Sequence, residues 1–142
     1  MTARSQGWTR PKVVLVDHGS PQAAVAEVRN RLGEQVRAEL VNEVEALVVA
    51  SMERREGDAY AFNEPLLATV LRAPLFNQGK VVIALQFLSP GRHAGPGGDI
   101  AEICEAAEKE LPALHTRMTE PIAVDARLVA LLAERMGQAR PI

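Results

Sequence analysis

Two histidines, His18 and His93, lie in glycine-containing segments that each follow an apolar run. His18 comes directly after the run 12–17, and His93 lies within 86–99, a loop with four glycines and two prolines. Such a loop has no packing requirement for a histidine, so we expect it to present His93 to a bound group. Neutral imidazole is a ligand for divalent zinc, cobalt, nickel or iron. Two imidazoles would leave coordination positions open, which indicates a metal held for use or transfer.

The other candidate side chains each have a simple structural interpretation beside a functional one. His115 lies within a short predicted strand after Pro112, which favours a structural or surface role. Asp17 either orients His18 or caps its turn. Glu53 either reaches the site or belongs to a solvated, charged loop. Cys104 falls on an apolar helical stripe and is expected in the core.

Three apolar runs and a weaker, short fourth segment predict strands, and four amphipathic segments predict helices. The strands are expected at 12–17, 46–50, 81–85 and 114–118, and the helices after Ser20, after Asn63, from Asp99 and after Asp125. These four polar residues suit helix caps, Asp99 together with Glu102. The alternation predicts an α/β fold of three layers, with a four-stranded parallel sheet and helices on both faces. We expect one domain over 1–142, with loose tails at 1–10 and 138–142.

The apolar positions of the first and last helices predict which face of each packs on the sheet. In the first helix they are Val25, Val28, Leu32, Val36 and Leu40. In the last helix they are Leu128, Val129, Leu131, Leu132 and Met136. Both stripes are expected to face inward.

Strand order decides whether the two histidines meet. In small doubly wound sheets the first and third strands commonly lie side by side, and ligands bind beyond their carboxyl ends. That order would bring the loops of His18 and His93 together. Each loop leads into a helix, whose positive dipole end favours a neutral imidazole. We therefore expect the two rings to converge on one ion above this edge of the sheet.

Composition limits the class of protein. A formal charge of −2 over 142 residues displays no basic face for nucleic acid. The single cysteine excludes an internal disulfide and a thiolate metal cluster. No apolar run approaches the roughly 20 residues that span a bilayer, and residues 1–10 lack the apolar centre of a signal peptide. We expect a cytoplasmic protein with no membrane partner and no organic cofactor.

Three motifs resemble those of the short sirohydrochlorin chelatases, the CbiX-like family, over most of the chain. The first is Asp-His-Gly-Ser at 17–20, directly after the first expected strand. The second is Phe-Leu-Ser-Pro-Gly-Arg-His at 87–93, followed by Gly-Asp-Ile at 98–100. The third is Thr-Glu-Pro-Ile at 119–122, before the last helix. The second motif is the most specific, and its order after the first strengthens the match.

The resemblance implies a chelatase-like fold and insertion of a divalent metal into sirohydrochlorin. Cobalt would serve cobalamin synthesis and iron siroheme synthesis, and nickel insertion occurs in the wider family. By position, His18 and His93 match the metal-site histidines, and they act with Glu64 as expected catalytic residues. The expected substrate-binding residues are Ser20, Arg92, Gly95, Gly97 and Gly98. Arg92 would pair with one tetrapyrrole carboxylate and the glycine amides at 95–98 would bind another.

One segment departs from the family pattern. Met52-Glu53 and Glu64-Pro65 match the two ends of an acidic family segment, but an extra charged stretch, 54–63, separates them here. Either glutamate can therefore face the site. Short family members pair as homodimers, and pairing is expected here too.

Two other functions fit parts of the pattern. The chain would be a non-catalytic metal or tetrapyrrole carrier if it binds without turnover, which the extra stretch keeps open. It would be a phosphotransfer domain if His18 carried a phosphoryl group, but His93 and its motif would then have no role.

Overall fold

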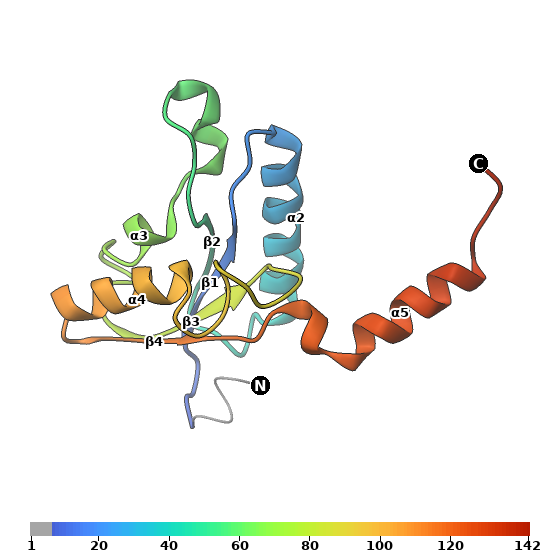
Figure 1. Ribbon diagram of the computed structural model, residues 1–142. Helices are drawn as coiled ribbons and strands as arrows, with labels where there is room; N and C mark the ends of the chain where they lie inside the picture. Colours follow the sequence, from blue (N-terminus) through green and yellow to red (C-terminus); the bar gives the residue numbers. More distant parts are fainter. Residues whose placement is uncertain (1–6) are drawn as a thin grey trace.

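The computed structural model describes residues 7–142, which include a four-stranded, all-parallel sheet (Figure 1). The strands are β1 (Lys12–Asp17), β2 (Leu47–Ser51), β3 (Gly79–Leu85) and β4 (Leu114–Met118). Their order is β2-β1-β3-β4, so β1 and β3 are neighbours, as the sequence predicts. Every residue of β1 is buried, which explains its uninterrupted apolar run. The predicted α/β fold is confirmed.

Helices lie on both faces of the sheet. Helix α2 (Ala23–Glu39) covers one face, and the short α3 (Leu67–Val70) and α4 (Asp99–Glu110) cover the other (Figure 1). The larger apolar core, which includes Val14, Val16 and Ile83, lies under α3 and α4. A smaller core around Val13 and Val82 meets the last turns of α2.

The first half of α2 packs with a face that the apolar pattern does not predict. Val25 and Val28 are 41% and 56% exposed, so their predicted inward orientation is wrong. The buried positions of this helix are Ala26, Arg29 and Gly33. A Cβ atom at Gly33 would lie 2.2 Å from Val49 Cγ1, so α2 approaches β2 too closely for a larger residue there. The periodicity misses this face because Arg29, its central residue, is charged.

Of the four predicted caps, only Asp125 is observed. It accepts a hydrogen bond from the Arg127 amide at the start of α5 (Ala126–Gly137), and bonding to Arg127 lowers the pKa of Asp125 to about 2. Helix α2 begins only at Ala23, and the Ser20 hydroxyl accepts from the Gln22 amide instead. Asn63 ends the 3₁₀ helix η1 (Asp58–Asn63), and its amide binds the backbone of Ser20.

Asp99 does not cap α4 either, since its carboxylate binds His93. The predicted caps of α2, α3 and α4 are therefore wrong for one physical reason. Ser20, Asn63 and Asp99 use their side chains to order the loops at the sheet edge, and none of the three is the N-cap of its predicted helix.

The apolar stripe of the last helix, α5, does not face inward, so that prediction is wrong. Helix α5 follows a short 3₁₀ helix, η2 (Ile122–Val124), and extends away from the sheet (Figure 1). None of its residues is buried, and Val129, Leu132 and Met136 are 66%, 57% and 78% exposed. The amides of Ile122 and Ala123 bond to the carbonyls of Phe87 and Leu88, which fixes the start of this extension. The stripe exists, but none of its residues is buried, and the start of α5 contacts the neighbouring η2.

The N-terminal tail is partly attached. Residues 1–6 of the expected tail lie outside the described residues, but Trp8 packs against the smaller core. Lys80 and Arg117 both contact the Trp8 ring, with charged groups 5.8 Å and 5.6 Å from its centre. Within 7–142, no helix is long and apolar enough to cross a membrane.

Candidate metal centre

The adjacency of β1 and β3 brings His18 and His93 together. Val16 pairs with Leu85 across these strands, so the two following loops leave the sheet side by side. The ring centres lie 4.7 Å apart, with an edge-to-face angle of 79°. His18 and His93 are 75 positions apart in the sequence, and one strand pairing brings them together. Both side chains are partly open to solvent, at 44% and 36% exposure.

Hydrogen bonding fixes which nitrogen of each ring is free. His18 Nδ1 lies 3.0 Å from the Gly19 carbonyl oxygen, and His93 Nδ1 lies 2.5 Å from Asp99 Oδ2. Both partners are acceptors, so Nδ1 carries the hydrogen in each neutral ring. The lone pair is then on Nε2 of both histidines. This is the arrangement by which a carbonyl or carboxylate orients a metal-binding imidazole.

Glu53 is the carboxylate nearest to His18. Its Oε1 lies 3.4 Å from His18 Nε2, the nitrogen that carries the lone pair. Two electron-rich atoms held this close repel unless a proton or cation lies between them. The backbone also joins these two residues, because the Glu53 amide donates to the His18 carbonyl. The pair therefore makes a small region that favours positive charge.

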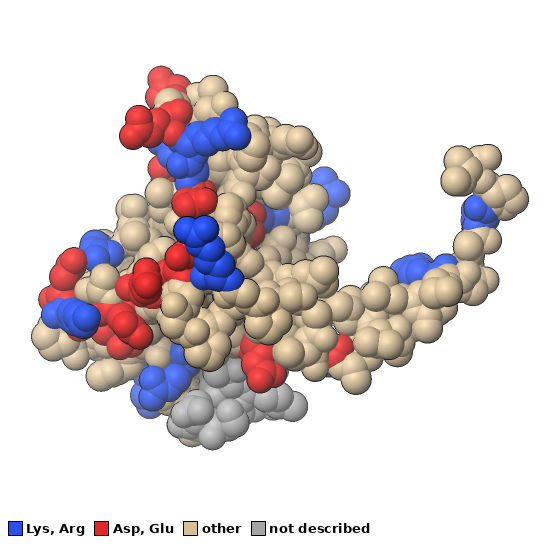
Figure 2. All heavy atoms as spheres, viewed as in Figure 1, with Lys and Arg blue, Asp and Glu red and all other residues tan. Residues whose placement is uncertain are grey.

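Glu64 is engaged elsewhere. Its Oε1 pairs with Arg54 Nε at 2.9 Å, and its Oε2 accepts from the Leu66 amide at 3.1 Å. Arg54 belongs to the extra stretch 54–63, so that stretch holds the second glutamate of the acidic segment. Figure 2 shows basic and acidic side chains gathered over this part of the molecule, at the top of the view. Of the two glutamates, the structure places Glu53 against His18.

The turn after His18 allows no side chain at Gly19. Gly19 has a φ of +92°, and a Cβ there would lie 1.9 Å from the Glu53 carbonyl oxygen. Asp17 holds this turn, because its Oδ1 accepts from the Gly19 amide at 3.1 Å. Of the two roles expected for Asp17, the structure shows the turn cap.

The glycine-rich loop closes on the first turn of α4. The amides of Gly98, Asp99 and Ile100 donate to the carbonyls of Gly95, Arg92 and His93. A Cβ at Gly98 would lie 2.9 Å from the Arg92 carbonyl oxygen, so this contact needs glycine. The helix amides are thus already bonded within the loop. Gly95 and Gly97 keep amides without a partner in residues 7–142.

Two further residues expected to touch the substrate, Arg92 and Ser20, differ in how firmly the rest of the chain holds them. Arg92 is exposed and makes no ion pair within the described chain. Ser20 is held at both backbone atoms by Asn63, with distances of 3.0 Å and 2.8 Å. Sequence reasoning missed Asp99 as the partner of His93, although the spacing of six residues across a glycine loop was the available signal.

The number of protein ligands is small. Within residues 7–142, no three His, Cys, Asp or Glu side chains are arranged to hold one ion. Cys104 is buried on α4, and burial raises the pKa of its thiol to about 11, so it stays neutral and apolar. His115 is exposed on β4, at the outer edge of the sheet. The centre therefore consists of two oriented imidazoles beside one carboxylate, open on the solvent side.

Comparison with protein families decides the assignment. The sequence model of CbiX matches residues 12–139. The chain belongs to the CbiX family. A comparison with curated proteins gives no match. The predicted family is confirmed, and membership implies a chelatase that acts on a tetrapyrrole with a divalent metal as its other substrate.

In this CbiX chain, Asp99→Asn tests the orientation of His93. The amide keeps the size of the carboxylate but binds the ring proton more weakly, so the Nδ1-bound hydrogen is less favoured. We expect the affinity for Co²⁺ to fall by about 10–100-fold, the usual effect of losing such a partner. Isothermal titration measures it. Glu102→Gln, one turn along α4, is the matched control, and an equal loss in both variants would contradict the assignment.

Proposed function

We propose that this CbiX chain inserts Co²⁺, or alternatively Fe²⁺, into sirohydrochlorin in the cytoplasm, as a step of cobalamin or siroheme synthesis. The observation that carries the proposal is the pair of imidazoles with both Nε2 lone pairs free at an open edge of the sheet. Two nitrogens bind a divalent ion without enclosing it, so a macrocycle can approach the remaining positions. A lone cysteine, which can form no internal disulfide, fits a reducing compartment.

The reaction exchanges two protons for one ion. The tetrapyrrole loses two pyrrole N–H protons, the metal forms bonds to the pyrrole nitrogens, and the bonds from the metal to His18 and His93 break. Glu53 would accept the first proton, because its Oε1 is the carboxylate oxygen that lies beside His18 Nε2. Once the metal leaves, the freed imidazoles can accept the second proton. Glu64 takes this role only if its pair with Arg54 opens.

The carboxylates of the tetrapyrrole need donors beside the histidines. Arg92 is exposed and unpaired in the same loop as His93, and its planar guanidinium suits bidentate binding of a carboxylate. The free amide of Gly97, which is exposed, supplies a further donor, whereas Gly95 is buried, and Ser20 supplies a hydroxyl. Gly98 contributes by shaping the loop, since its amide is already bonded.

Anaerobic metal insertion tests the proposal. Purified protein, sirohydrochlorin and Co²⁺ or Fe²⁺ are mixed, and insertion is followed by absorbance. We expect a rate above that of the uncatalysed mixture. Binding of metal or tetrapyrrole without a rate above background would favour the non-catalytic carrier instead, and phosphoryl transfer to His18 would favour the phosphotransfer domain.

We further propose that the chain acts as a homodimer, in which α5 of each copy lies in a groove of the other. The groove has a volume of about 490 Å³ and is lined by Trp8, Val13, Val36, Leu40, Val82 and Ala84. It lies beside α2 on the face of the sheet that the larger core does not use. Helix α5 offers the matching stripe, and its surface is mostly uncharged in Figure 2.

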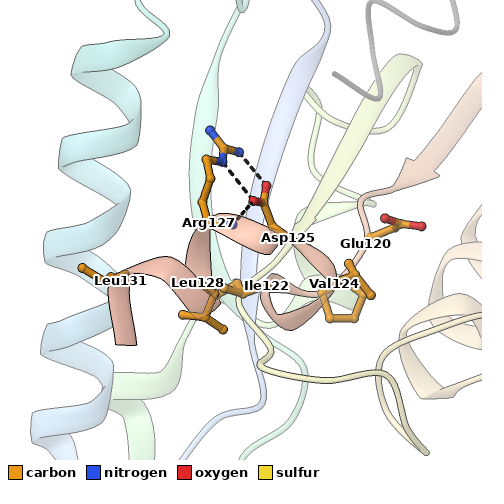
Figure 3. A pocket seen from close by; sticks show the side chains of 8 residues that line it. Glu120, Ile122, Val124, Asp125, Arg127, Leu128 and Leu131 are labelled. Carbon is orange, nitrogen blue, oxygen red and sulfur yellow. Dashed lines mark hydrogen bonds and ion pairs between the residues drawn. The ribbon is translucent and has the colours of Figure 1, made fainter. Parts of the chain in front are cut away.

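The expected area is enough for a specific dimer. Half of the side of a helix about 18 Å long and 10 Å wide is roughly 280 Å². Two exchanged helices, each covering as much of a groove, would bury roughly 1,100 Å², above the roughly 1,000 Å² that a specific interface needs. A second hollow of about 510 Å³ lies between η2 and the start of α5, lined by Ile122, Leu128 and Leu131 (Figure 3). Neither hollow is lined by His18 or His93.

Leu132→Asp is expected to convert the dimer to a monomer, because it places a charge in the centre of the apolar stripe. Ala130→Asp is the control, since about 100° per residue puts it on the opposite side of the helix. Light scattering gives the mass, and fluorescence of Trp8, the single tryptophan, reports on the groove. A red shift should accompany dissociation. A wild-type monomer with a shielded Trp8 would mean that α5 folds onto its own groove, and a dimer with an unchanged Trp8 in Leu132→Asp would place the interface elsewhere.

A further inference from the structure

Arg29 is a buried charge that the chemistry described so far does not use. It lies on α2 and is 1% exposed, among the most buried side chains of the described chain. Burial lowers the pKa of its guanidinium, an effect that Asp17 opposes. Arg29 Nη1 lies 3.8 Å from Asp17 Oδ1, so the pair is close without direct hydrogen bonding. A buried charge of this kind needs several partners to be tolerated.

The partners of Arg29 lead to the His18 turn by two routes. In the first, Arg29 donates to the Ser51 hydroxyl, which donates to Asp17 Oδ1 at 2.7 Å, and that oxygen also accepts from the Gly19 amide. In the second, Arg29 Nη1 donates to the Asn63 carbonyl at 3.0 Å. The Asn63 side chain then holds both backbone atoms of Ser20.

Both residues that follow His18 are therefore held through Arg29, although Arg29 does not touch His18. The position of the Gly19 carbonyl matters, because that oxygen fixes the hydrogen on His18 Nδ1. Asp17 has little alternative support, since its Oδ2 is buried and has no hydrogen-bond partner. If Arg29 is lost, the Asp17 carboxylate keeps only the Ser51 hydroxyl and the Gly19 amide in an apolar setting.

We propose that Arg29 is a positioning residue for the metal centre, which holds the Gly19 carbonyl where it selects the metal-binding tautomer of His18. The expected effect on metal affinity rests on the proposed function. The expected effect on the His18 tautomer does not. No other residue of α2 connects the ends of β1, β2 and η1 in the described chain. The buried charge is thereby assigned to ligand geometry at a site one loop away.

Two variants interrupt the network at different points. Arg29→Met removes all donors at similar length, and Ser51→Ala removes the relay to Asp17 with a small loss of volume. Gly33→Ala is the matched control, because it crowds the same helix against Val49 one turn further on but has no link to the turn. If Arg29→Met does not fold, Ser51→Ala decides.

The first measurement needs no metal. Nitrogen-15 NMR at about pH 8, where unperturbed imidazole is neutral, gives the tautomer of each ring. We expect His18 to lose its preference for hydrogen on Nδ1 in Arg29→Met and Ser51→Ala. His93 should stay unchanged, since Asp99 orients it independently. Gly33→Ala should be less stable to urea while both tautomers match the wild type.

The second measurement is Co²⁺ affinity by titration, which should fall about 10–100-fold in the two network variants and not in Gly33→Ala. The inference is overturned if folded variants keep the His18 tautomer, or if Gly33→Ala changes it equally. It is also overturned if the tautomer changes while the affinity of a metal-binding protein stays the same. A wild-type protein that binds no Co²⁺ would defeat the proposed function, and the tautomer comparison would still test the role of Arg29.

Discussion

Replacement of either His18 or His93 with alanine should lower the rate of metal insertion by more than about 100-fold, because even the loss of a ligand's hydrogen-bond partner costs 10–100-fold. One remaining imidazole cannot orient the ion, and its other positions would be filled by water. The two rings lie 4.7 Å apart and come from different loops, so neither can replace the other. We expect both single variants and the double variant to be similarly inactive, as residues acting as a unit are not additive.

The assay is anaerobic insertion into sirohydrochlorin, with Co²⁺ titration of each variant as a separate readout. His115→Ala is the matched control, because it removes the remaining histidine from an exposed position on β4. It should insert metal at the wild-type rate. Wild-type rates in His18→Ala and His93→Ala, or an equal loss in His115→Ala, would refute the two-imidazole mechanism.

Replacement of Gly19 with alanine is expected to destabilise the fold by about 3 kcal/mol or more. Two costs act together. The residue has a φ of +92°, which L side chains rarely adopt, and its Cβ would overlap the Glu53 carbonyl oxygen at 1.9 Å. The obstacle is backbone, so no rotamer change relieves it. The displaced loop would also separate His18 from Glu53.

Urea denaturation of Gly19→Ala against wild type measures this effect. Gly91→Ala is the control, because a Cβ at Gly91 meets no atom within 4 Å and its φ is not in the left-handed region. Its free energy of unfolding should change by less than about 0.5 kcal/mol. A stable Gly19→Ala protein would show that the turn relaxes at low cost and that the contact with Glu53 is not required.

The strands and the meeting of the histidines could be predicted from sequence because both follow from local rules. The runs 12–17 and 114–118 coincide with β1 and β4, and the order that pairs β1 with β3 is common in small doubly wound sheets. Once that pairing is assumed, the ends of two strands must be neighbours. Specific family motifs in the same two loops pointed to the same residues.

The buried face of α2 and three of the four caps could not be predicted because they depend on partners far along the chain. Arg29 is buried on account of Ser51 and Asn63, which are 22 and 34 positions away. An argument from periodicity counts arginine as polar, so it places Arg29 on the exposed face of α2 and Val25 and Val28 on the buried face. Asn63 and Asp99 look like caps locally, but each makes its bond across a loop. The apolar stripe of α5 can be read from its periodicity, but nothing in the local sequence shows that this stripe stays unburied in the chain.

The partial exposure of both imidazoles has a consequence for how the protein handles its cargo. With roughly two-fifths of each ring in contact with water, a captured ion would keep much of its hydration and exchange quickly with the surroundings. Such a protein would dispense metal on demand instead of storing it. Ordinary chelators in a purification buffer would strip it, and its supply in a cell would track the free concentration of the ion from moment to moment.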